Sequence, residues 1–66
     1  MKIKINGEPQ EIPEGLSVRA MLDHLGMSGA RVAIERNLEI LPRTEWTGTP
    51  VQDNDSFEIV HFVGGG

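Results

Sequence analysis

Residues 17–26 read SVRAMLDHLG, and this stretch decides the fold because it carries the clearest helix signal in the chain. Ser17 is of the residue type that caps a helix N-terminus through its side chain. Apolar residues then recur at helical spacing and form one stripe: Val18, Met21, Leu22 and Leu25. Gly26 stands where a left-handed residue ends a helix. The pattern predicts an amphipathic helix from Val18 to Leu25 or Gly26.

A hairpin is expected before the helix. Residues 2–5 alternate lysine with isoleucine, the period of a half-buried strand. Asn6-Gly7 follows, and both residue types tolerate the positive φ that a two-residue hairpin turn requires. The return strand is expected at residues 10–12, where Pro13 ends it because proline has no backbone N–H to donate.

Three further strands and a helical turn are expected after the helix. Val32 and Ile34 alternate with polar or small residues in a third strand. A short strand around residues 39–41 leads into Pro42, which suits the start of a single helical turn reaching Trp46. Trp46 is interpreted as a packing residue at the edge of the core. The last strand is expected from about Ser56 to Val63.

The order of these elements defines a fold class. A hairpin, one main helix packed across the sheet and a long last strand describe an α+β fold of the β-grasp type with a mixed sheet. The last strand lies centrally and runs parallel to the first, as the right-handed crossover rule allows. Residues 1–63 are expected to form the domain, and residues 64–66 a flexible glycine tail.

Composition narrows the classes of function. Sixty-six residues suffice for one small domain with a thin core. A net charge of −4 argues against nucleic-acid binding, which needs a basic patch. The absence of cysteine excludes disulfides, thiolate metal sites and sulfur carriage on a side chain. No apolar run is long enough to span a membrane and no signal peptide is evident, so a cytoplasmic location is expected.

The C-terminal Gly64-Gly65-Gly66 is chemically informative. Residues without a Cβ can pass through a channel too narrow for other types. The group that could react there is the α-carboxylate of Gly66, which belongs to no side chain. The alternative interpretation is a frayed terminus without a function.

Six parts of the chain carry a resemblance to a known family: Val32-Ala33-Ile34, Asn37, Ile40 to Trp46, Val51 to Asp55, Glu58-Ile59-Val60 and Gly64 to Gly66. On these residues the chain resembles the ThiS family, the small ubiquitin-like sulfur carriers of thiamin (thiazole) biosynthesis. The similarity spans essentially the whole chain. Two positions depart from the family pattern, where glycine is common. Leu38 follows Asn37, so that turn is expected to take another type, while Asn54 tolerates the left-handed region.

The resemblance implies that the chain is not an enzyme but a protein-borne co-substrate with no permanently bound cofactor. A ThiF-like adenylyltransferase would spend ATP to adenylate the Gly66 carboxylate. A sulfur donor such as a cysteine desulfurase would then displace AMP and leave a thiocarboxylate. A ThiG-like thiazole synthase would accept that sulfur into the thiazole ring.

The last strand and the tail supply the candidate site residues. Gly66 is the reactive end, Gly65 lets the backbone pass a narrow slot, and Gly64 adds reach. Alternation along the strand turns Phe57 and Ile59 toward the core. Two apolar residues then point to the opposite face, where we expect a docking patch for the activating enzyme and the synthase: Val60 and Phe62.

Other polar residues receive structural interpretations. His24 and His61 lie far apart in sequence without a third ligand, so no metal site is predicted. Asp53 and Asp55 lack the rest of a calcium loop and are interpreted as turn residues. Arg43 is expected to pair with a nearby carboxylate.

Alternatives to the thiazole carrier remain open from the sequence. A carrier for molybdopterin synthesis, tRNA thiolation or cysteine formation shares the same fold and tail. A ubiquitin-like modifier would be joined through Gly66 to lysines of other proteins. A non-covalent binding module would not need Gly65 and Gly66 at all.

Overall fold

The computed structural model describes residues 1–27 and 31–62. These residues form five strands, one α-helix and one short 3₁₀-helix, η1. In chain order the elements are β1 (Lys2–Ile5), β2 (Glu8–Glu11), α1 (Val18–His24), β3 (Val32–Arg36), β4 (Glu39–Leu41), η1 (Arg43–Glu45) and β5 (Ser56–His61).

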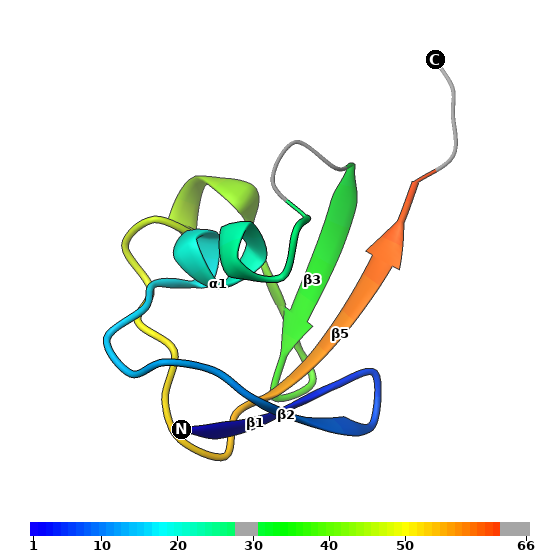
Figure 1. The fold of residues 1–66 in the computed structure, drawn as a ribbon. Helices are drawn as coiled ribbons and strands as arrows, with labels where there is room; N and C mark the ends of the chain where they lie inside the picture. Colours follow the sequence, from blue (N-terminus) through cyan, green and yellow to red (C-terminus); the bar gives the residue numbers. More distant parts are fainter. Residues whose placement is uncertain (28–30, 63–66) are drawn as a thin grey trace.

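The five strands make one mixed sheet with the order β2-β1-β5-β3-β4. The last strand, β5, lies at the centre, parallel to β1 and antiparallel to β3. Helix α1 crosses one face of this sheet, which we call the inner face (Figure 1). The α+β arrangement predicted from the element order, with the last strand beside the first, is therefore confirmed.

The core lies between α1 and the inner face of the sheet. Three apolar residues predicted for the helix stripe are buried: Val18, Met21 and Leu22. Alternate residues of β1, β3 and β5 meet them, because side chains along a strand point to opposite faces in turn: Ile3, Ile5, Val32, Ile34, Phe57 and Ile59. Trp46 is 3% exposed and donates its indole N–H to the Leu41 carbonyl oxygen at 3.1 Å, which confirms its packing role.

Both ends of α1 are capped as the sequence predicts. The Ser17 hydroxyl accepts a hydrogen bond from the Ala20 N–H at 3.1 Å. At the other end Gly26 has a φ of +77° and donates to the Asp23 carbonyl, while Met27 N–H donates to the Leu22 carbonyl at 2.8 Å. This pair of bonds is the Schellman arrangement, which stops the helix one residue earlier than the predicted range.

Two strand boundaries and one ion pair differ from the predictions. Strand β2 begins at Glu8, directly after the tight turn, and not at residue 10. Strand β5 ends at His61, and Val63 lies outside the described residues. Among the described residues no carboxylate pairs with Arg43; its guanidinium lies 5.2 Å from the centroid of the Trp46 ring, a cation–π contact.

Asparagine opens two similar two-residue turns. Asn6 and Gly7, between β1 and β2, have φ values of +51° and +84°. Asn37 and Leu38, between β3 and β4, have +50° and +71°. Positive φ at both central residues is the type I′ pattern, whose twist matches that of the flanking strands. The expectation of another turn type at Leu38 is therefore wrong: strand pairing imposes this geometry although leucine bears a Cβ that disfavours it.

Replacing Leu38 tests this strain. Leu38→Gly removes the Cβ and should raise the free energy of unfolding by about 1 kcal/mol. Leu38→Ala is the matched control, because it removes most of the exposed side chain but keeps the Cβ, and it should change stability little. Urea unfolding of the three proteins checks the prediction. Equal stabilities for the glycine and alanine variants would contradict it.

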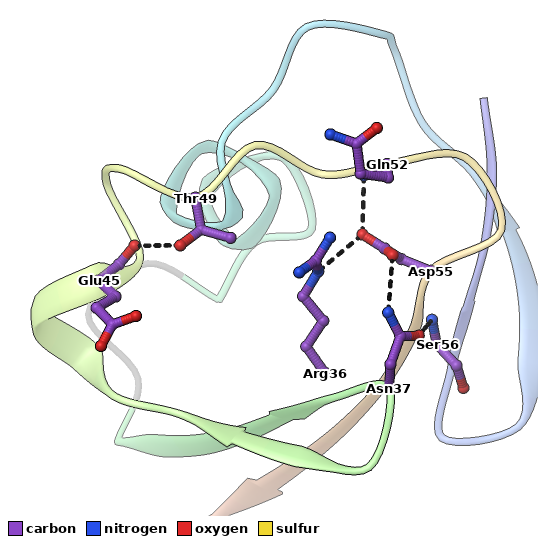
Figure 2. A network of polar contacts seen from close by, with 7 residues as sticks. All are labelled: Arg36, Asn37, Glu45, Thr49, Gln52, Asp55 and Ser56. Atoms are coloured by element: carbon purple, nitrogen blue, oxygen red, sulfur yellow. Dashed lines mark hydrogen bonds and ion pairs between the residues drawn. The ribbon is translucent and has the colours of Figure 1, made fainter.

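A buried carboxylate fixes the start of β5. Asp55 is 4% exposed and accepts hydrogen bonds from three segments. The donors are the Gln52 backbone N–H at 2.8 Å, Arg36 Nε at 3.0 Å and Asn37 Nδ2 at 3.1 Å. The Asn37 side chain in turn accepts from the Ser56 N–H at 3.0 Å, so the β3–β4 turn is tied to β5 (Figure 2).

These contacts also decide the charge of Asp55. Burial alone would raise the pKa of this carboxyl by disfavouring the charged form. The hydrogen bonds from Gln52, Asn37 and Arg36, with the positive charge of Arg36, outweigh burial and lower the pKa below its ordinary value of 3.8. The ionised carboxylate is thus the form that the fold favours.

Asp55→Asn should lower the free energy of unfolding at pH 7 by about 3 kcal/mol, because it leaves Arg36 without its buried partner. Since the folded pKa is depressed, this stabilisation is present above pH 3.8 and disappears as the pH falls through the folded value. The stability gap between wild type and variant should therefore shrink below pH 3.8 in urea titrations. Asp23→Asn, at an exposed carboxylate 3.6 Å from Arg19, is the control and should change little. A gap independent of pH would refute the assignment.

Candidate functional site

The candidate site is where β5 leaves the sheet. Phe57 and Ile59 face the core at 0% and 5% exposure, as predicted. Val60 and Phe62, predicted for the opposite face, are 61% and 57% exposed. We call the sheet surface opposite α1 the outer face. Two large apolar side chains, one in β5 and one directly after it, are therefore exposed to solvent.

The backbone of this segment is held beyond the last strand residue. His61 pairs in register with Val32, and the Phe62 N–H donates to the Arg31 carbonyl at 2.8 Å. Position and direction of the chain are thus fixed through Phe62. The predicted reactive residues, Gly64, Gly65 and Gly66, lie outside the described residues.

Apolar exposure on the outer face extends further than the sequence interpretation recognised. Ile40 of β4 is 78% exposed and Leu38 of the preceding turn is 88% exposed. Ala33 of β3 pairs with Val60 and is also exposed. The signal for Ile40 was present, because Leu41 packs partly against the core and neighbouring residues of a strand point to opposite faces. It was missed because a three-residue strand has almost no alternation to read.

The two histidines of the described residues do not take part in a metal site. His24 and His61 are both exposed. Within residues 1–27 and 31–62 no group of three potential ligands from histidine, aspartate or glutamate could hold a metal ion. In the same residues, no helix is long and apolar enough to cross a membrane. Asp53 lies in the turn before β5, as predicted, and its carboxylate also accepts a hydrogen bond from the Lys2 N–H at 2.9 Å, a contact that the sequence did not predict.

Comparison with known proteins agrees with this fold. The model of the ThiS family matches residues 3–66. The crystal structure of the thiamine biosynthesis protein ThiS from Geobacter metallireducens matches with a TM-score of 0.85 and 36% identity, covering all of both chains. The sheet and helix are therefore the β-grasp fold that the sequence predicted.

Two curated relatives extend the comparison. The sulfur carrier protein ThiS of Escherichia coli is 30% identical, and the match covers the whole of both chains. A thiazole synthase of Paramagnetospirillum magneticum is 46% identical over 66 residues. The chain spans only 20% of the length of that synthase. A family match over nearly the whole sequence, with full-length relatives of the same name, establishes that this chain belongs to the ThiS family.

Proposed function

We propose that this chain is the sulfur carrier of thiazole formation in thiamin biosynthesis, with the Gly66 carboxylate as its working group. The observation that carries the proposal is the full-length match to the Escherichia coli sulfur carrier protein. The geometry supports it, because the central strand leads toward the glycines beside exposed apolar residues, Val60 and Phe62.

The proposed chemistry needs activation of an unreactive group. A carboxylate is a poor electrophile, so a ThiF-like adenylyltransferase joins it to the AMP part of ATP and releases pyrophosphate. The acyl-adenylate then has AMP as its leaving group. The terminal sulfur of a persulfide on a donor such as a cysteine desulfurase attacks the acyl carbon and displaces AMP, which leaves an acyl disulfide at Gly66. A thiol of the donor or of the activating partner then reduces this acyl disulfide, so that Gly66 is released as a thiocarboxylate and the thiol ends in a protein disulfide. The carrier itself supplies the chain end and the docking surface, and the activating partner supplies ATP.

A thiazole synthase of the ThiG type is the proposed acceptor of the sulfur. A segment 46% identical to this chain forms part of a protein named thiazole synthase. When a carrier-like segment and the rest of a synthase belong to one polypeptide, each has a high effective concentration near the other. That arrangement supports transfer of sulfur from this family to the synthase over transfer to another acceptor.

The protein isolated from its own cells during thiamin starvation should contain a species about 16 Da heavier, because sulfur replaces oxygen at Gly66. Oxidation of one of the three methionines adds nominally the same mass. Alkylation with iodoacetamide distinguishes the two, since only a thiocarboxylate reacts. Intact-mass and fragment spectra should place the adduct at Gly66. The control, a chain lacking Gly65 and Gly66, should give no adduct. An unreactive chain, or one recovered as larger protein conjugates, would contradict the proposal.

We further propose that Val60 and Phe62 dock the activating enzyme. Each leaves more than half of its surface exposed in the free protein, and burial of apolar area is the main favourable term in association. Phe62 stands four positions before Gly66 in the sequence, so docking through this side chain would keep the chain end within reach of the activating enzyme.

Phe62→Asp should lower the rate of adenylation about tenfold at carrier concentrations below KM, because a charge would replace buried apolar surface. Phe62→Leu is the matched control and should retain most of the rate. Pyrophosphate release with the purified adenylyltransferase measures both. Unchanged rates for the aspartate variant would show that this side chain does not dock. Circular dichroism should show both variants folded, since Phe62 lies outside the core.

A further inference from the structure

A shallow groove crosses the outer face between β4, β3 and β5. Its volume is about 150 Å³. Its apolar walls are Ile40 and Val60, and two carboxylates stand at its rim, Glu35 and Glu58. Pockets for small-molecule substrates are typically larger, about 300–1,000 Å³. The groove therefore has the size for one side chain of another protein.

The two carboxylates are arranged unfavourably in the free protein. Glu35 and Glu58 are directly opposite each other on β3 and β5, and both are exposed. Like charges in opposite positions of neighbouring strands destabilise a sheet. Among the described residues, neither carboxylate forms an ion pair. A cation placed between them would remove this repulsion.

The cations nearest this groove are held by other groups or lie across β5 from Glu35. Arg36, next to Glu35 in sequence, points to the other face and holds Asp55 at 3.0 Å. Arg43 lies over the Trp46 ring. Lys4 is in register with Ser56, on the far side of β5 from β3. The cation that suits the acidic rim is therefore best supplied by a partner.

We propose that an arginine of the activating adenylyltransferase enters this groove, packs its aliphatic stem on Ile40 and Val60, and pairs with Glu35 and Glu58. This inference rests on the proposed function and specifies how the carrier is recognised. Arginine fits better than lysine because its planar guanidinium presents several N–H donors in fixed directions and can serve two carboxylates at once.

The arrangement gives orientation as well as attraction. The acidic pair spans β3 and β5, and the only two lysines of the chain lie in β1, on the other side of β5 from β3: Lys2 and Lys4. A partner that presents a cation to the first and an anion to the second can dock in one direction only. Charge complementarity of this kind selects partners and speeds association.

The test uses the purified adenylyltransferase of the same organism and three carriers: Glu35→Gln, Glu58→Gln and the double variant. Each substitution keeps size and removes charge. The dissociation constant, measured by calorimetry at low and high salt, should rise about tenfold for the double variant at low salt and less at high salt. Ile40→Ala should also weaken binding, with little dependence on salt. Glu14→Gln, an exposed loop carboxylate outside the groove, is the control for net charge and should stay within twofold of wild type.

A second measurement on the same variants needs no partner. Because the repulsion is lost, Glu35→Gln and Glu58→Gln should unfold at equal or higher temperature than wild type, so weaker binding cannot come from a damaged fold. Wild-type carrier that is bound and adenylated, with unchanged affinity in the double variant, would overturn the groove proposal alone. Wild-type carrier that is neither bound nor adenylated would overturn the proposed function and the groove proposal together.

Discussion

The carboxylate of Asp55 is the contact on which the arrangement of this small sheet depends. It gathers donors from the loop before β5, from the end of β3 and from the β3–β4 turn. Through Asn37 these bonds also fix the first residue of β5. A chain of 66 residues has a thin core, so polar contacts at the sheet margin carry a larger share of its specificity.

Two asparagine side chains add hydrogen bonds to the central strand, β5. Asn6, besides forming the first turn, donates to the Ile59 carbonyl at 3.2 Å and accepts from the Ile59 N–H at 2.7 Å. It thereby acts as an extra strand residue after β1 ends. Asn37 makes similar contacts with β5 from the side of β3: its backbone N–H donates to the Ser56 carbonyl, and its side chain accepts from the Ser56 N–H. The two turns therefore reverse the chain and also bind their hairpins to β5 through hydrogen bonds.

Local signals were enough to predict most of the fold. The helix, its two caps and the Asn6-Gly7 turn depend on residues within a few positions of one another, and all of these were predicted. The Asp55 network was not, because Asp55 and its partner Arg36 are 19 positions apart and no local pattern joins them. The turn at Leu38 was mispredicted for the related reason that distant strand pairing overrides the preference of one residue.

The candidate site was predictable in part. The exposure of Val60 and Phe62 follows from alternation along a long strand, a purely local rule. The facing carboxylates Glu35 and Glu58 depend on the register of β3 against β5, which the sequence does not specify. The domain leaves its outer face uncovered because its single helix can shield only one side of the sheet.

The parallel pairing of β1 with β5 has a mechanical consequence. The N-terminus of β1 lies at one end of this strand pair, and the C-terminal end of β5 lies at the opposite end. A pull on the C-terminal end, taken up at the N-terminus, acts along the strands and strains their cross-links side by side, among them Lys4 N–H to the Asp55 carbonyl and Asn6 N–H to the Phe57 carbonyl. Bonds loaded in shear must break together, whereas bonds that are peeled break one at a time. We therefore expect the domain to resist unfolding when a partner pulls on its C-terminal end.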